Sequence, residues 1–244
     1  MLLFDEFKTH DEEWIKWYIR EILSYPMGEF SILDPSFNMK TCVDIGANIG
    51  GFSKVASQYF EKVLAFEPSK AAFRSLLEYA APNTEVYNLA VSNRTGDVAN
   101  LTCQTCTNTG KFHSHNASIV WELGDEKEKA ITIGLDKIYE LAETDFIDYL
   151  KIDCEGSEWD ILLYQDLSRI GLICAEIHAP PKQKGDFETL RAKLIHQMRA
   201  DGFEVFLYSE HNLFARNSKF DIPCSLVFDR ERLTMIQTKH ADLF

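Results

Sequence analysis

The chain of 244 residues has no run of about 18 apolar residues, so we expect no transmembrane helix. Its first stretch, MLLFDEFKTHDEEW, is acidic and has no long apolar core, which is unlike a signal peptide. A cytoplasmic location is therefore the expectation. Low-complexity segments and internal repeats are also absent, and the composition is that of an ordinary globular protein.

Positive charge is scarce. The chain has 25 Lys and Arg against 38 Asp and Glu, a formal net charge of −13. No cluster of Lys or Arg resembles the patches that follow nucleic-acid phosphates. A polyanion would be repelled on average, so a nucleic-acid substrate is disfavoured. The sequence does not indicate an oligomeric state.

Cysteine is present at six positions, but without an export signal we expect no disulfides. One group resembles a zinc set: Cys103 and Cys106, followed by His113 and His115. The cysteine spacing suits zinc, whereas His-x-His is tighter than the usual finger pattern. The alternative is a polar flap over an acceptor pocket, in which one of these histidines contacts substrate.

Strands and helices alternate along most of the chain, which predicts an α/β fold. The expected strands are 41–46, 62–68, 85–91, 148–153 and 171–178, and the expected helices are 51–60, 69–81, 157–167 and 187–202. This alternation is typical of a mostly parallel sheet with helices on both faces. Three further strands, 203–209, 212–217 and 224–229, follow one another without helices, which indicates an antiparallel hairpin at one edge.

Two segments fall outside this alternation. Residues 11–24 show apolar residues on one helical face and acids in the first turn, so we expect an N-terminal helix. Residues 92–133 are polar and show short β-like alternation. The predicted organisation is a helical extension at 1–40 and an α/β domain at 41–244, with an inserted β-hairpin or lid at 92–133.

The stretch VDIGANIGGFS, residues 43–53, passes from a buried strand through glycines into a helix. In open α/β sheets, ligands bind beyond the carboxyl ends of strands, and Gly46 and Gly50 would let backbone approach a ligand closely. The outer glycines match the dinucleotide pattern Gly-x-Gly-x-x-Gly, but Asn48 occupies the middle position. No Gly-Lys-Ser/Thr follows, so the loop is not a P-loop.

Two carboxylates narrow the choice of nucleotide. Asp44, at the strand end, would repel a pyrophosphate but attract the ammonium group of S-adenosylmethionine. Glu67 lies 17 residues after Gly50, at the end of the next strand, where a carboxylate accepts hydrogen bonds from ribose. The pattern therefore favours S-adenosylmethionine over a dinucleotide. The remaining alternative is a tight turn without a ligand, in which the combination of Asp44, Gly46, Gly50 and Glu67 would be a coincidence.

Lys151 is unusual because it falls in a predicted central strand, where a buried lysine needs a carboxylate partner. If this strand lies between those of Asp44 and Glu176, either acid is a candidate partner. A structural ion pair is favoured over a direct catalytic role.

A rim of acids with one histidine is predicted at the ends of the same strands: Asp153, Glu155, Glu158, Glu176 and His178. Such a rim suits removal of a proton from an acceptor hydroxyl. His178 is the first candidate for the base because its ordinary pKa lies nearest neutrality, and Asp153 or Glu155 is the alternative. The same groups apart from Glu158, with Asp153, Glu176 and His178 foremost, also suit a divalent metal ion.

Taken together, VDIGANIGGFS, AFEPS, NLAVSN, LKIDCEGSEWDIL and AEIH resemble the FkbM family of S-adenosylmethionine-dependent methyltransferases, over about residues 40–180. The resemblance implies the Rossmann-like, three-layer class I methyltransferase fold, with a seven-stranded sheet and one reversed edge hairpin. It also implies methyl transfer to oxygen, on sugars or natural products.

The resemblance further implies roles for residues at the matching positions. The expected cofactor site comprises Asp44, Gly46, Asn48 and Gly50 at the methionine end, Glu67 with Pro68 at the ribose, Asn88 near adenine, and Asp153. Trp121, Trp159 and Tyr164 are candidates for stacking on an acceptor ring or for core packing. Two alternatives stay open: N-methylation of a protein side chain or small amine, and S-adenosylmethionine binding without catalysis.

Overall fold

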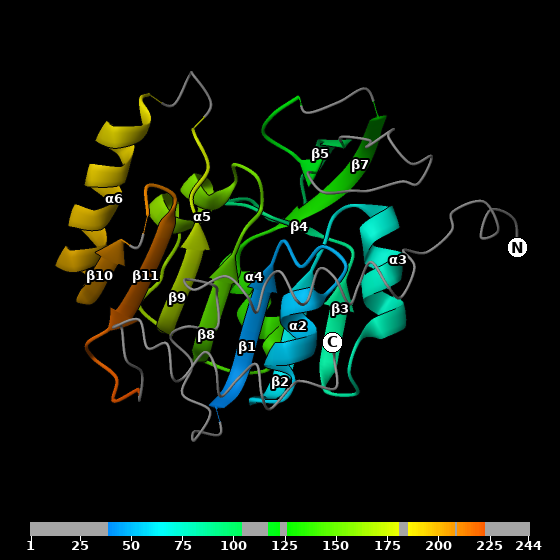
Figure 1. Ribbon diagram of the computed structural model, residues 1–244, viewed down its shortest axis with the longest axis horizontal. Coiled ribbons are helices and arrows are strands. Elements are labelled where there is room, and N and C mark those ends of the chain that lie inside the picture. The colour runs from blue at the N-terminus through cyan, green and yellow to red at the C-terminus, as the bar shows by residue number, and fades with distance from the viewer. Residues whose placement is uncertain (1–38, 104–116, 123–125, 181–184, 208, 223–244) are drawn as a thin grey trace, which may run out of the picture.

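A seven-stranded sheet forms the centre of the molecule (Figure 1). The computed structural model describes residues 39–103, 117–122, 126–180, 185–207 and 209–222. In spatial order the strands are β10 (Phe203–Leu207), β11 (Asn212–Asn217), β9 (Ile170–Glu176), β8 (Ile147–Ile152), β1 (Met39–Ile45), β2 (Phe60–Phe66) and β3 (Thr84–Tyr87). Only β11 runs in the direction opposite to that of the other six strands of this sheet. The predicted mostly parallel sheet with an antiparallel edge hairpin is confirmed.

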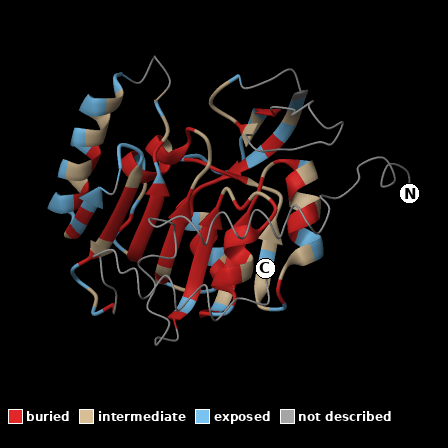
Figure 2. Cartoon of the chain, in the orientation of Figure 1, coloured by how far each residue is buried: buried red, intermediate tan, exposed pale blue. Residues whose placement is uncertain are grey.

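Helices cover both faces of the sheet. The helices α2 (Gly51–Ala56) and α3 (Lys70–Tyr79) cover one face, and α4 (Leu135–Ala142), α5 (Glu158–Tyr164) and α6 (Phe187–Ala200) cover the other (Figure 1). The central strands are buried on both faces, as Figure 2 shows, which explains why their sequences read as continuous apolar runs. Within the described residues, no helix is long and apolar enough to cross a membrane.

The side chains of β1 and β8 alternate between two apolar clusters. Cys42 and Tyr149 pack with α2, whereas Val43 and Leu150 pack in the cluster that contains α4 and α5. The register pairs Cys42 with Tyr149 and Asp44 with Lys151. Because side chains alternate along a strand, Asp44 and Lys151 face the α2 side. Lys151 is thus beside a carboxylate in the middle of the fold.

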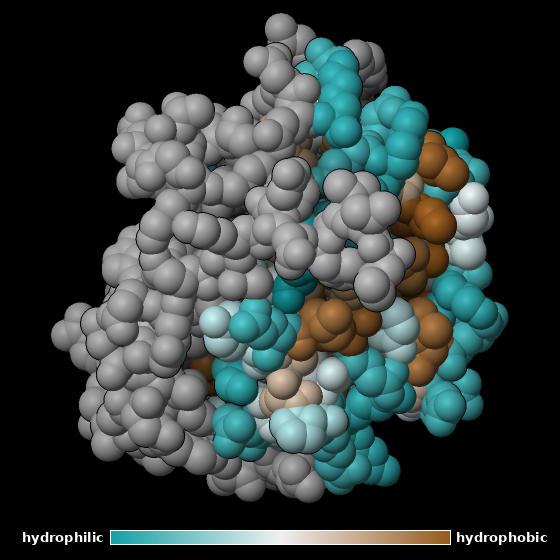
Figure 3. Space-filling model, turned by 90° about the vertical axis from the view of Figure 1, so that its right-hand side faces the viewer, coloured by the Kyte–Doolittle hydropathy of each residue, from teal (hydrophilic) through white to brown (hydrophobic). Residues whose placement is uncertain are grey.

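A second sheet lies beyond the carboxyl ends of the central strands (Figure 1). It has four strands, in the order β4 (Ala90–Val91), β7 (Glu126–Ile133), β5 (Val98–Cys103) and β6 (Ala117–Ser118). The antiparallel pair of β5 and β7 confirms the β-hairpin predicted between the third and fourth parallel strands. Figure 3 views the molecule from the side of α3 and shows hydrophobic side chains on its surface. Leu77 of α3 and Val98 and Ile131 of the second sheet are exposed large hydrophobic residues.

The structure differs from three sequence predictions. The strand predicted at 85–91 is divided: β3 ends at Tyr87, and Ala90–Val91 pairs with β7 in the second sheet. The helix predicted at 51–60 ends at Ala56, because Phe60 already begins β2 and is buried there. Helix α4 was not predicted. The predicted helix 11–24 and strand 224–229 lie outside the described residues.

Candidate functional site

A pocket opens at the carboxyl ends of β1, β2 and β8, where the sequence predicts a ligand. Its lining consists of Gly46, Asn48, Glu67, Pro68, Ala117, Asp153, Cys154 and Glu155. All of these except Ala117 and Cys154 were predicted site residues. Parallel strands bring their ends to one edge of the sheet, and this explains why positions far apart in the sequence meet here.

The glycines of the first loop allow tight packing of the chain on itself. Gly46 has φ 76°, and a Cβ there would lie 1.6 Å from the carbonyl oxygen of Asp153. Gly50 has φ 91°, and its Cβ would lie 2.6 Å from Leu76 Cδ1. Gly46 still lines the pocket. Gly50 is not in this lining, and the space that its side chain would occupy is filled by Leu76 of α3.

Glu67 joins two loops of the pocket. Its Oε2 accepts a hydrogen bond from the backbone N–H of Asn48, and its Oε1 accepts one from the N–H of Ser69, each at 2.8 Å. Burial raises the pKa of Glu67 to about 7, against the lowering effect of these two hydrogen bonds. Asn48 adopts φ 52°, a left-handed conformation that turns its N–H toward the carboxylate. The predicted acid therefore lies on the wall of the pocket.

Asp44 lies beneath the pocket and takes no part in its lining. It is fully buried, its Oδ2 accepts a hydrogen bond from Ser53 Oγ at 2.6 Å, and its Oδ1 lies 3.2 Å from Lys151 Nζ. Lys151 also donates to the carbonyl of Gly46 at 3.0 Å. The structural ion pair predicted for Lys151 is confirmed, with Asp44 as its partner. The pair supports the glycine loop from below.

Asn88 fastens the loop after β2. Its Nδ2 donates to the carbonyls of Glu67 and Pro68, at 2.9 Å each. Beside this loop lies a second, mainly apolar pocket, which shares Gly46, Pro68, Ala117 and Cys154 with the first and adds Phe66, Leu89, Val91 and Ile119 among others. Asn88 is not in the lining of either pocket, and its amide instead holds the conformation of the loop after β2.

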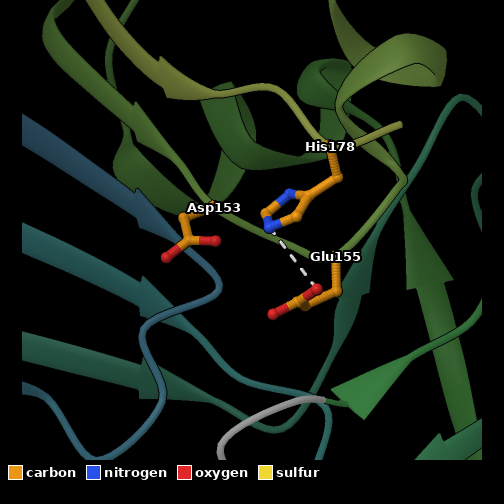
Figure 4. Close-up of side chains that lie close together, drawn as sticks. All are labelled: Asp153, Glu155 and His178. Atoms are coloured by element: carbon orange, nitrogen blue, oxygen red, sulfur yellow. Dashed lines mark ion pairs between the residues drawn. The ribbon is translucent and has the colours of Figure 1, made fainter. Parts of the chain in front are cut away.

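Asp153 and Glu155, which line the pocket, lie close to His178 (Figure 4). Asp153 follows β8, Glu155 lies in the next turn, and His178 comes two residues after β9. His178 Nε2 lies 3.4 Å from Glu155 Oε2 and 3.9 Å from Glu176 Oε1. Glu155 has φ 55°, which is unusual for a residue with a side chain. The predicted rim is thus assembled from two neighbouring strands.

Glu158 was predicted among the rim acids, but it lies within the protein. It is 0% exposed, and its Oε1 lies 3.1 Å from His178 Nδ1. Both of its oxygens also accept backbone hydrogen bonds, from Cys154 at 3.0 Å and from Gly156 at 2.8 Å. The first turn of α5 carries this side chain inward, whereas Asp153 and Glu155 belong to the lining of the pocket.

The charged groups of the rim shift the pKa values of His178 and Glu155, and this changes which of the two is suited to act as a base. Burial lowers the pKa of His178, but the hydrogen bond to Glu158 and the charges of Glu158, Glu155 and Asp153 outweigh it and raise this pKa to about 9. Burial raises the pKa of Glu155 to about 7. A pKa of about 9 favours the protonated imidazole at neutral pH, so the base role of His178 stays a prediction that its ordinary pKa does not support in this environment.

The metal sets predicted from the sequence differ from what the structure gathers. Asp153, Glu155 and His178 have candidate ligand atoms within 4.8 Å of one another, whereas the predicted Glu176 is exposed and is not in that group. At neutral pH, a proton on His178 competes with any ion there. Of the predicted zinc set, Cys103 is buried in β5, and Cys106, His113 and His115 lie outside the described residues.

Two residues of the insertion contact the rim, although no sequence motif predicts these contacts. Ser118 Oγ donates to the carbonyl of Glu155 at 2.6 Å, and the ring of Trp121 meets His178 edge-on at 5.6 Å between centroids. From the sequence, Trp121 is only one of three aromatic candidates for stacking on an acceptor ring. Of the others, Trp159 is fully buried and Tyr164 is exposed on α5. Tertiary structure alone brings the insertion to this place.

The comparison with known protein families agrees with the motifs. The family model described as "Methyltransferase FkbM domain" matches residues 44–205, and no curated protein sequence gives a match. Among solved structures, the methyltransferase FkbM from Methylobacillus flagellatus KT is 16% identical with a TM-score of 0.48, and the match covers 82% of this chain and 50% of that one. M. capricolum TrmK in complex with S-adenosyl-homocysteine is 10% identical with a TM-score of 0.40, over 89% and 74% of the two chains. The chain thus spans half the length of the M. flagellatus protein.

Proposed function

Because this chain belongs to the FkbM family of methyltransferases, we infer that it transfers a methyl group from S-adenosylmethionine to an acceptor hydroxyl on a saccharide or natural product. The observation that carries this inference is one pocket that runs from Glu67 to the Asp153–Glu155 turn. Residues suited to hold the donor and a group suited to take a proton lie in the same lining.

The residues present suit S-adenosylmethionine. Glu67 is fixed by two backbone N–H groups, and its carboxylate keeps lone pairs for ribose hydroxyls. The adjoining apolar pocket, with Phe66 and Leu89 in its lining, suits a flat ring system. Asp153 supplies negative charge to the pocket, which favours a cationic donor over a pyrophosphate.

The chain's own groups would align the acceptor and remove its proton. When bound, S-adenosylmethionine supplies a methyl group on positively charged sulfur; the acceptor oxygen bonds to the methyl carbon as the carbon–sulfur bond breaks and its electron pair stays on sulfur. Glu155 takes the hydroxyl proton, because its pKa of about 7 leaves much of it ionised at neutral pH. The imidazolium of His178, 3.4 Å away, stabilises that ionised carboxylate.

The test is a methyl-transfer assay with isotopically labelled S-adenosylmethionine and pools of hydroxyl and amine acceptors. Glu155→Gln should lower turnover by about 100-fold or more, the range of general base catalysis, while S-adenosylhomocysteine still binds. Products that form on amines alone would replace this proposal with N-methylation. Binding without turnover on any pool would favour a protein that binds the cofactor without catalysis.

A further inference from the structure

Glu158 is a buried carboxylate that contacts His178 of the rim and the backbone of the turn that carries Glu155. Its two oxygens accept the backbone N–H groups of Cys154 and Gly156, the residues on either side of Glu155. Oε1, which accepts the hydrogen bond from Cys154, also lies 3.1 Å from Nδ1 of His178. One side chain therefore holds the turn that carries Glu155 and the ring that pairs with it.

The backbone of His178 is held from the same helix. Trp159, the residue after Glu158, donates its indole N–H to the carbonyl of His178 at 2.9 Å. Both residues are fully buried in α5. Consecutive residues of one helix thus hold the ring and the carbonyl of a histidine from the neighbouring strand end, and such double anchoring fixes the direction of the ring.

We propose that Glu158 is a positioning residue for proton transfer, which keeps a proton on Nδ1 of His178 and directs Nε2 toward Glu155 and the pocket. The link to proton transfer rests on the function proposed above, whereas the contact between Glu158 and His178 does not. A carboxylate that fixes the tautomer and orientation of a histidine is a recurrent device in proteins.

The surroundings of the ring explain which nitrogen keeps its proton. Four carboxylates surround the ring: Glu158 from α5, Glu155 from the turn, Asp153 from the end of β8, and Glu176 from the end of β9, while Trp121 of the insertion packs on it without charge. The contact at Nδ1 is shorter and its carboxylate is fully buried, whereas Glu155 is partly exposed and Glu176 is exposed. When the imidazolium loses one proton, the proton on Nε2 leaves.

Nitrogen-15 NMR of histidine-labelled protein tests this, with the His178 signals identified by their absence in His178→Gln. At a pH at which His178 is neutral, we expect the tautomer with hydrogen on Nδ1. The tautomer with hydrogen on Nε2 would overturn the proposal. Because this measurement needs no acceptor, its outcome is separate from success or failure of the methyl-transfer assay.

Glu158→Gln provides the second readout. We expect the pKa of His178 to fall by about one unit or more and the preference for Nδ1–H to be lost, whereas Glu204→Gln, a surface carboxylate paired with Arg216, should leave both unchanged. An unaltered His178 in folded Glu158→Gln contradicts the proposal. If that variant does not fold, the tautomer of the wild-type protein decides the matter.

Discussion

Lys151 Nζ lies 3.2 Å from Asp44 Oδ1, and both side chains are almost fully buried at adjacent positions of β8 and β1. The ion pair lies directly under the glycine loop, whose carbonyl at Gly46 also accepts from Lys151. Burying two charges is costly, so the pair is favourable only while both partners are present. It therefore couples the stability of the fold to the shape of the pocket.

Lys151→Met should lower the free energy of unfolding by about 3–5 kcal/mol, because it leaves Asp44 charged and buried without its partner. Urea denaturation measures this. The matched control is Lys137→Met, which removes an exposed pair with Glu140 on α4 and should cost below about 1 kcal/mol. Equal losses in the two variants would contradict the structural role assigned to the buried pair.

Gly46→Ala should be among the most damaging single changes, with a loss above about 4 kcal/mol or no folded protein. The new Cβ would lie 1.6 Å from the carbonyl oxygen of Asp153, in addition to the strain of φ 76°. Gly96→Ala is the control, because Gly96 has φ 87° but no atom within 4 Å of its added Cβ, so only about 1–2 kcal/mol is expected. Comparable urea midpoints would show that conformational strain alone matters.

Glu67→Gln should weaken S-adenosylhomocysteine binding by about tenfold or more, since hydrogen bonds to a charged group contribute about 1.5–3 kcal/mol. Glutamine also cannot accept from both Asn48 and Ser69 in the present geometry, because one of its two terminal atoms is a donor. Calorimetry gives the affinity, with Glu85→Gln on β3 as the control. Unchanged affinity in Glu67→Gln would remove this residue from the cofactor site.

The stability that His178 provides should depend on pH. Its folded pKa of about 9 is above the ordinary value of 6.5, so this stabilisation is complete below about pH 6.5 and is lost as pH rises through 9. We expect the unfolding free energy of the wild type, relative to His178→Gln, to fall by about 1–2 kcal/mol between pH 6 and pH 9.5, less than the full shift because several carboxylates share the effect. Parallel pH profiles for the two proteins would refute the raised pKa.

Much of the fold was predictable because local sequence patterns indicate most of its strands and helices. Continuous apolar runs marked β1, β8 and β9, and the predicted end of α6 near Gly202 agrees with the φ of 97° found there. The division of 85–91 between two sheets was not predictable, since pairing of Ala90–Val91 with β7 depends on a partner about 40 residues away. Local propensity carries no information on such a partner.

The candidate site likewise has features that the sequence predicts and features that depend on distant contacts. The sequence by itself determined the family motifs, the positions of Gly46, Glu67 and Asp153 at strand ends, and an ion pair for Lys151, because strand direction and alternation place these groups without knowledge of distant contacts. Only the tertiary structure decided that Glu158 turns inward to His178 and that Ser118 reaches Glu155. Burial and neighbouring charge set the pKa values of the rim, and both arise only when separate segments pack together.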